Sequence, residues 1–107
     1  MSGRPIKRVP AGWTEVVLVC RKCSRKLGGE GFGRNGDQRL AKALRRALDL
    51  PGDDRKAAIG IVETGCLDVC PKGAVVAVAA SRPADWLVIP EGTPMDQVID
   101  RLGLKGS

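Results

Sequence analysis

The chain has 107 residues, of which 43% are hydrophobic and 28% charged, so it is long enough for one domain with a modest core. It contains no histidine and no tyrosine, which excludes a Ser-His-Asp triad, an imidazole general base and any metal site with imidazole ligands. Its formal net charge of +6 would attract acidic partners or polyanions.

Residues 1–13 are expected to form an extended lead-in, because Pro5 and Pro10 interrupt them, and 14–107 are expected to form the single folded domain. The N-terminus is basic, but no apolar h-region follows it, so we expect no secretory signal. The longest uncharged apolar stretch, Gly73–Ala80, is too short to span a bilayer. These features predict a cytoplasmic protein without membrane contact, whose thiols stay reduced.

The first half of the domain is predicted to contain a strand, a glycine-rich loop and a helix. Glu15–Cys20 is a short, continuous run rich in β-branched residues, which indicates a buried strand. No periodicity is present in Arg21–Gly36, which we therefore expect to be a long loop. Asp37–Leu50 is predicted to be a helix capped by Asp37 and ended by Pro51, because its apolar residues fall on one stripe. The stripe consists of Leu40, Leu44, Ala47 and Leu48.

The second half is predicted to contain three strands and a closing helix. The strands are Ala57–Val62, Gly73–Ala80 and Trp86–Ile89. Residues 81–84 would form the hairpin connection between the last two strands. In the closing helix, Thr93 is the expected N-cap, Pro94 occupies the first helical position and Gly103 ends the helix. Its apolar stripe consists of Met95, Val98, Ile99 and Leu102.

This order of elements predicts an α/β fold of the thioredoxin-like type, with a mixed four-stranded sheet and two main helices. A right-handed strand–helix–strand unit, a hairpin and a closing helix make up that core. The first two strands of such a unit run parallel, so their carboxyl ends meet at the same end of the sheet.

Four cysteines fall into two pairs that this topology would bring together. Cys20 and Cys23 form a C-x-x-C turn at the end of the first strand, and Cys66 and Cys70 lie between the second and third strands. Both pairs should therefore converge at one end of the sheet. In a reducing compartment, four clustered cysteines favour metal binding or redox catalysis over structural disulfides.

Three chemistries fit four converging thiolates. Zinc would bind them tetrahedrally and make the chain a four-cysteine binding module with a basic face. A 2Fe–2S cluster would use the same four ligands. Alternatively, Cys20 and Cys23 would act as a redox dithiol, with Cys66 and Cys70 as small hydrophobic residues. The dithiol needs a helix N-terminus at its first sulfur, whereas we expect a loop after Cys20.

The segment C-L-D-V-C-P-K-G-A-V-V-A-V, which begins at Cys66, resembles the second half-site of thioredoxin-like 2Fe–2S ferredoxins. The same unit occurs in the small two-iron subunit of respiratory complex I, and the resemblance extends over residues 14–104. It implies one-electron transfer through a 2Fe–2S cluster by an electron carrier, with a separate enzyme supplying the substrate chemistry. The implied ligands are Cys20, Cys23, Cys66 and Cys70. The spacing of the first pair is shorter than is usual in this family.

Basic residues flank the cysteines and have two explanations. They would favour the reduced form of a cluster and dock an acidic redox protein, or they are the solvated cations of an exposed loop. These residues are Arg21, Lys22, Arg25, Lys26 and Lys72. Nucleic-acid binding is disfavoured, because aromatic residues for base stacking are nearly absent. Related proteins are often dimers, and the sequence neither supports nor opposes a homodimer.

The segment Gly31–Gly36 matches G-x-G-x-x-G, and we interpret the match as coincidental. A dinucleotide-binding loop follows its strand immediately and has an acidic residue at the end of the second strand, whereas Asp53 and Asp54 precede that strand here. We expect the glycines to let the loop wrap the metal site. Asp68, bracketed by two cysteines, is interpreted as a solvent-facing or turn-capping carboxylate.

Overall fold

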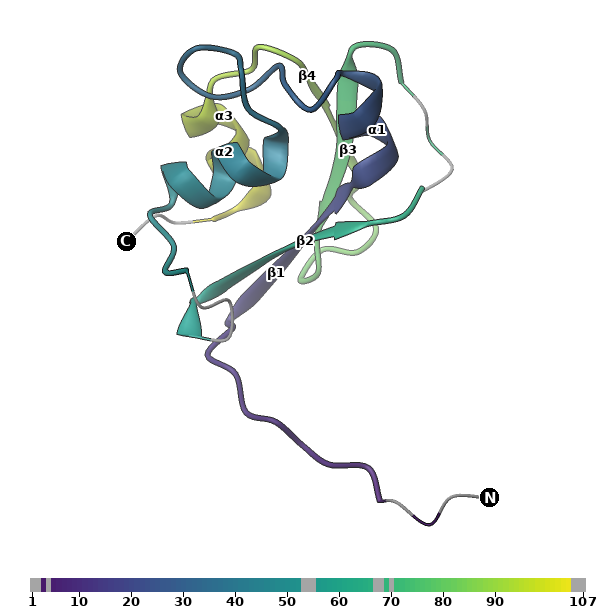
Figure 1. Ribbon diagram of the computed structural model, residues 1–107, viewed down its shortest axis with the longest axis vertical. Coiled ribbons are helices and arrows are strands. Elements are labelled where there is room, and N and C mark those ends of the chain that lie inside the picture. Colours follow the sequence, from purple (N-terminus) through teal and green to yellow (C-terminus); the bar gives the residue numbers. More distant parts are fainter. Residues whose placement is uncertain (1–2, 4, 53–55, 67–68, 70, 105–107) are drawn as a thin grey trace.

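A computed structural model of the chain describes residue 3 and residues 5–52, 56–66, 69 and 71–104. Within these residues the protein is α/β, with a four-stranded mixed sheet and three helices (Figure 1). The elements are β1 (Glu15–Cys20), α1 (Arg21–Lys26), α2 (Leu40–Ala47), β2 (Ile59–Thr64), β3 (Ala74–Ala79), β4 (Leu87–Pro90) and α3 (Met95–Leu102). None of the described helices is long and apolar enough to cross a membrane.

The sheet has the strand order β2-β1-β3-β4. β1 and β2 are parallel along their whole length, from Glu15 opposite Ile59 to Cys20 opposite Thr64. β3 is antiparallel to both β1 and β4. The predicted parallel pair and mixed sheet are therefore confirmed, and the carboxyl ends of β1 and β2 lie together at one end of the sheet.

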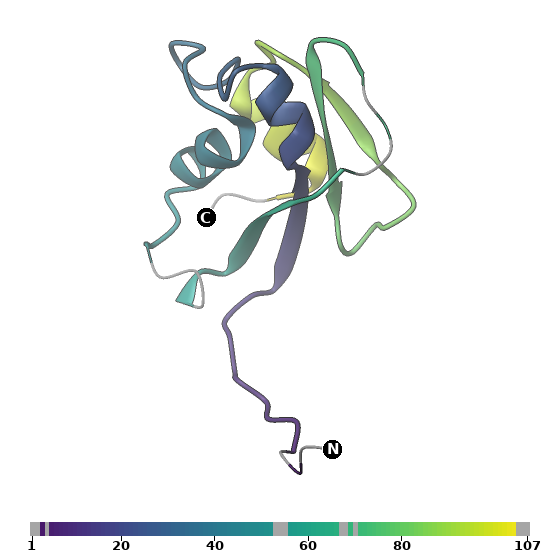
Figure 2. The same cartoon turned by 45° about the vertical axis from the view of Figure 1, so that its right-hand side comes forward.

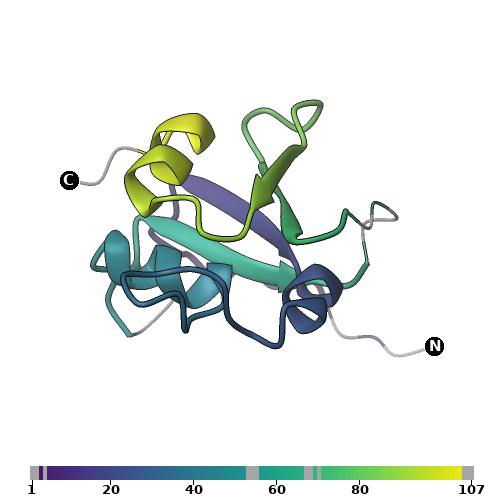
Figure 3. The same ribbon diagram turned by 90° about the horizontal axis from the view of Figure 1, so that it is seen from above.

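One face of the sheet packs against α2 and α3, which lie side by side in contact with each other (Figure 3). Alternate side chains of a strand point to the same face, and on β1 this face carries Val17 and Val19, both fully buried. Each fully buried side chain of this size contributes about 1.5–3 kcal/mol, so this contact holds the two helices on the sheet. The helical residues in the same core cluster include Leu40, Leu44, Val98 and Leu102.

The starts of α2 and α3 differ from the prediction. α2 begins at Leu40, its N-cap residue Arg39 makes no side-chain capping bond, and Asp37 is not the cap. The reason is an antiparallel bridge, in which Phe32 and Gln38 exchange two backbone hydrogen bonds of 2.9 and 3.0 Å and draw the preceding residues out of the helix. The N-cap of α3 is Pro94, because the hydroxyl of Thr93 donates instead to the Pro90 carbonyl, at 2.6 Å.

The other boundaries shift by a few residues. β2 starts at Ile59 and continues to Thr64, because its pairing with β1 extends to Cys20. β4 ends at Pro90, which pairs with Ala74. Gly103, with a φ of 71°, ends α3 in the left-handed conformation, as predicted.

Residues 5–13 contain no helix or strand and extend away from the folded part of the chain (Figure 1). Their last residue, Trp13, packs on Gly60 of β2, where a Cβ atom would lie 2.5 Å from two atoms of the indole ring. Because Ile59 and Ile61 point toward the helices, Trp13 covers the opposite face of the sheet. The lead-in is thereby attached to the domain at its junction with β1.

Candidate metal centre

A short helix, α1, follows β1 without an intervening loop (Figure 2). Cys20 is its N-cap residue, in the extended conformation with φ −69° and ψ 115°. The backbone N–H of Cys23 donates to the Sγ of Cys20, at 3.5 Å, and so completes the cap. The hydroxyl of Ser24 donates to the Cys20 carbonyl, at 3.3 Å.

The prediction of a loop over Arg21–Gly36 was therefore wrong for its first six residues, Arg21–Lys26. A helix of fewer than two turns is too short to show an apolar repeat, and α1 buries only Cys23 and Ser24. It is stabilised by its cap and by contact with β3, neither of which leaves a periodic signal in the sequence. Ser24, which sequence reasoning did not single out, is part of the site.

The first cysteine pair is enclosed within the protein. Cys20 is 0% exposed and Cys23 is 1% exposed. The thiol of Cys23 donates to the carbonyl of Val69, with a distance of 3.7 Å between Sγ and the oxygen. Val69 belongs to the segment between β2 and β3, which is the segment that contains the second cysteine pair. Val69 therefore joins this segment to the first pair.

The second pair is described only in part. Cys66 is exposed and follows two residues after Thr64, the residue opposite Cys20 in the sheet. Cys70 and Asp68 lie outside the described residues. Among the residues that the structure describes, no three His, Cys, Asp or Glu side chains are arranged to hold a metal ion. Cys20 and Cys23 are thus brought together, and Cys66 does not complete a three-residue group with them.

Positive charge lies on the helix that follows Cys20. Four cations lie on the exposed surface of α1, and its first turn contains no acidic residue. They are Arg21, Lys22, Arg25 and Lys26. Beside them, Arg39 forms an ion pair with Glu63 at 3.1 Å, and Arg21 donates to the Glu63 carbonyl at 3.3 Å. Cations and a helix N-terminus both stabilise the thiolate form of a cysteine, which is the form that binds metals.

The helix also changes the comparison between metal binding and dithiol chemistry. A loop after Cys20 would leave no helix N-terminus at the first sulfur of a redox dithiol. The structure has α1 there instead, so this objection to a dithiol does not hold. Enclosure of the sulfurs replaces it with another objection. A dithiol that exchanges with a substrate disulfide needs an accessible attacking sulfur, and neither Cys20 nor Cys23 is accessible.

The glycine-rich loop contributes several residues to a cleft beside α2. Gly33, Arg34, Asn35 and Asp37 line a cleft with α2 and with residues near the start of α3, and none of the described residues in its lining is a cysteine. The backbone of the loop turns toward α2 because Phe32, buried in the core, pairs with Gln38. This part of the loop therefore lines a cleft beside α2, where the sequence led us to expect that its glycines would wrap the metal site.

Comparisons with models of protein families, with curated proteins and with solved structures found no match for this chain. The inference of function therefore rests on the chemistry of the side chains. Sulfur donors select zinc, copper(I) or iron–sulfur clusters, and a set of four cysteines fits both zinc and a 2Fe–2S cluster.

Proposed function

We propose that the chain is a thioredoxin-like 2Fe–2S ferredoxin, which carries single electrons for a separate enzyme. The proposed ligands are Cys20, Cys23, Cys66 and Cys70. The observation that carries the proposal is the enclosure of Cys20 and Cys23 against Val69, in the segment that contains the other two cysteines. The strand order β2-β1-β3-β4, with one parallel and two antiparallel pairs, supports the thioredoxin-like assignment.

The backbone allows Cys66 to reach the first pair. Parallel strands are separated by about 4.8 Å, and a residue spans at most about 3.6 Å of chain. Cys66, two residues after Thr64, therefore lies within reach of the end of β1, where Thr64 pairs with Cys20. The proposal requires the side chain of Cys66, which is exposed, to turn inward on binding.

The protein residues have three tasks in this proposal. The enclosure of Cys20 and Cys23 keeps water away from the sulfurs, and the N–H of Cys23 supplies a hydrogen bond to the Cys20 sulfur. The cations of α1 offset the negative charge of four thiolates and provide a surface for an acidic redox protein. When bound, the cluster supplies the reversible one-electron step.

The test is metal analysis of protein purified without oxygen. We expect about two irons and two acid-labile sulfides per chain, and a brown colour that bleaches on addition of dithionite. Serine variants at the four cysteines should each lose most of the iron. Lys22→Gln is the matched control, since it alters an exposed residue of the same site without removing a sulfur, and it should keep the iron. Stoichiometric zinc without colour would contradict the proposal and support the zinc-stabilised binding module.

Thiol–disulfide exchange at Cys20 and Cys23 is the second candidate, because α1 places a helix N-terminus and the Cys23 N–H at the Cys20 sulfur. This candidate predicts protein without metal and a disulfide that forms and is reduced reversibly. The measurement is a titration of the metal-free chain with mixtures of oxidised and reduced glutathione. A reversible two-electron couple that survives Cys66→Ser would favour exchange over the ferredoxin.

A further inference from the structure

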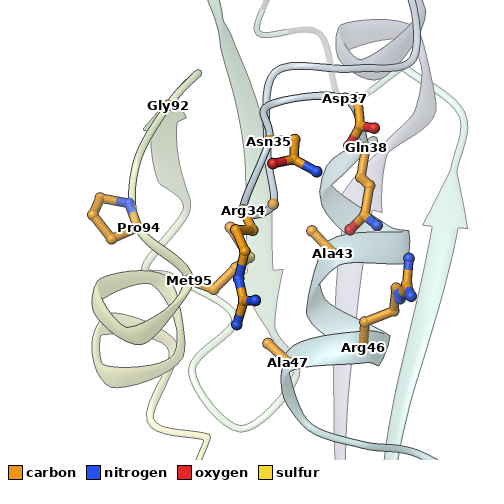
Figure 4. Close-up of a pocket in the computed structure, with 11 residues that line it drawn as sticks. Arg34, Asn35, Asp37, Gln38, Ala43, Arg46, Ala47, Gly92, Pro94 and Met95 are labelled. Atoms are coloured by element: carbon orange, nitrogen blue, oxygen red, sulfur yellow. The ribbon is translucent and has the colours of Figure 1, made fainter.

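A cleft of about 810 Å³ lies between the glycine-rich loop, α2 and the start of α3 (Figure 4). Its volume falls in the range of small-molecule binding sites, about 300–1,000 Å³. Ala43, Ala47 and Met95 give it an apolar lining, and Arg34 and Arg46 stand on either side of the two alanines (Figure 4). The ferredoxin proposal assigns no role to this cleft.

The wall that carries Arg34 is held in place by backbone hydrogen bonds. Phe32 and Gln38 form the antiparallel bridge, and the N–H of Gly31 donates to the Gly36 carbonyl at 2.9 Å. The N–H of Gly92 donates to the Gly31 carbonyl at 2.6 Å, which ties this loop to the segment before α3. The cleft is therefore formed by connected segments before any ligand binds, which lowers the entropic cost of binding.

Gly33 explains why the loop is rich in glycine at this point. Its φ is 88°, which disfavours other residues, and a Cβ atom there would lie 2.8 Å from the Gln38 side-chain oxygen. Gly33, the second glycine of the G-x-G-x-x-G match, is therefore favoured by the backbone conformation of the cleft wall.

The two arginines are not neutralised within the described part of the chain. The ion pair found there joins Arg39 and Glu63, and neither Arg34 nor Arg46 takes part in one. The amides of Asn35 and Gln38 add neutral donors to the lining, and Asp37 is its one carboxylate. Guanidinium groups bind phosphate and carboxylate in a fork of two hydrogen bonds. None of the described lining residues has an aromatic side chain on which a nucleobase would stack.

We propose that this cleft binds a compact organic polyanion, with at least two phosphate or carboxylate groups that pair with Arg34 and Arg46. The apolar floor would accommodate the short carbon skeleton between the charged groups. This inference does not depend on the metal content of the protein.

The test is calorimetric titration of the purified full-length chain, in a phosphate-free buffer of low salt, with pyrophosphate and separately with citrate. We expect saturable binding of one molecule of at least one probe per chain. Arg34→Gln and Arg46→Gln should each weaken it by about tenfold, which corresponds to one lost charge-assisted pair. Lys42→Gln removes the same charge from α2 outside the cleft lining and should change the affinity by less than about twofold.

Ala47→Glu provides a second variant, because it places a carboxylate on the exposed floor of the cleft and should abolish binding. Tighter binding of pyrophosphate would identify a phosphorylated ligand, and tighter binding of citrate a polycarboxylate. Absence of saturable binding of both probes would overturn the proposal. Equal weakening by Lys42→Gln and the two arginine variants would also overturn it, since diffuse attraction to a basic protein would then explain the binding.

Discussion

The two ends of β1 are closed by different kinds of contact. At the first end, the Glu15 carboxylate accepts the N–H groups of Val16 and Ser81, at 2.9 and 3.2 Å, and the Ser81 hydroxyl. At the second end, the Cys20 sulfur accepts the N–H of Cys23 at 3.5 Å, and the Cys23 thiol donates to the Val69 carbonyl at 3.7 Å. Oxygen and nitrogen form short, strong hydrogen bonds, whereas a thiol is a weak donor and a weak acceptor.

The two ends differ in the atoms that they offer to a ligand. The Glu15 end is complete, because the chain supplies both the donors and the acceptor. The cysteine end buries two thiols, and thiolates bind metals, so its stability should increase if a metal centre binds the sulfurs as proposed. Variants at the two ends test this contrast.

Cys20→Ser should have the largest effect. It removes a proposed ligand and places a hydroxyl where a fully buried thiol stands. We expect loss of the iron and of about 3 kcal/mol of unfolding free energy, which lowers Tm by roughly 12–24 °C. Iron analysis and thermal unfolding measure the two effects.

Cys66→Ser is the matched comparison, because the same change is made at an exposed position. It should also cost the iron, but in metal-free protein it should change the unfolding free energy by less than about 0.5 kcal/mol. Equal destabilisation of the two metal-free variants would show that the enclosure of Cys20 does not contribute to stability.

Gly60→Ala should have the next largest effect, near the Glu15 end. The added Cβ would lie 2.5 Å from the Trp13 ring, and overpacking of this kind costs about 1–3 kcal/mol. In a Trp13→Ala background the sign should reverse, because Ala is favoured over Gly in a strand by about 0.5–1 kcal/mol. Urea unfolding of the four proteins in this double-mutant cycle measures the coupling. The same cost in both backgrounds would contradict the contact.

The strands could be predicted because their signals are local. Glu15–Cys20 matches β1 residue for residue, since a continuous β-branched run is typical of a buried strand. The meeting of the carboxyl ends of β1 and β2 could also be predicted, because the order of the elements indicated that these two strands are parallel. The start of α2 could not be predicted in this way. It depends on the pairing of Phe32 with Gln38, which leaves no periodicity in the sequence.

The sequence predicted the residues of the candidate site, and the structure describes where three of the four cysteines lie. Four cysteines at two spacings indicated sulfur chemistry, and the order of the strands indicated where the pairs would meet. The enclosure of Cys20 and Cys23 could not be predicted, because it depends on α1 and on the approach of Val69 across the sheet end. The cleft with Arg34 and Arg46 depends on non-local contacts of the glycine-rich loop for the same reason.

Ser24→Ala tests how much the backbone contributes at the cysteine end. Its buried hydroxyl donates to the Cys20 carbonyl, and a neutral hydrogen bond of this kind contributes about 0.5–1.5 kcal/mol. We expect a loss within that range, measured by urea unfolding of the metal-free protein. Ser24→Cys retains a weaker donor and should lose less. A cost above that of Cys20→Ser would place the main support of this end in α1 and not in the thiols.

Glu15→Gln should have the smallest effect, and that effect should depend on pH. Burial alone raises the pKa of Glu15, but the hydrogen bonds from Ser81 and Val16, with the nearby charge of Arg82, outweigh burial and hold it below its ordinary value of 4.5. The unfolded chain therefore binds the proton more tightly. The stabilisation is complete above the ordinary pKa and is lost as the pH falls through the lower folded pKa.

The difference in unfolding free energy between the wild type and Glu15→Gln should therefore be below about 1 kcal/mol near neutral pH, because solvent screens this half-buried group. It should shrink further under acid conditions. Urea unfolding at a series of pH values measures it, and Ser81→Ala should reduce the pH dependence, since it removes one donor to the carboxylate. A difference that grows as the pH falls would contradict the lowered pKa, and with it the argument that this end of β1 is closed by the chain itself.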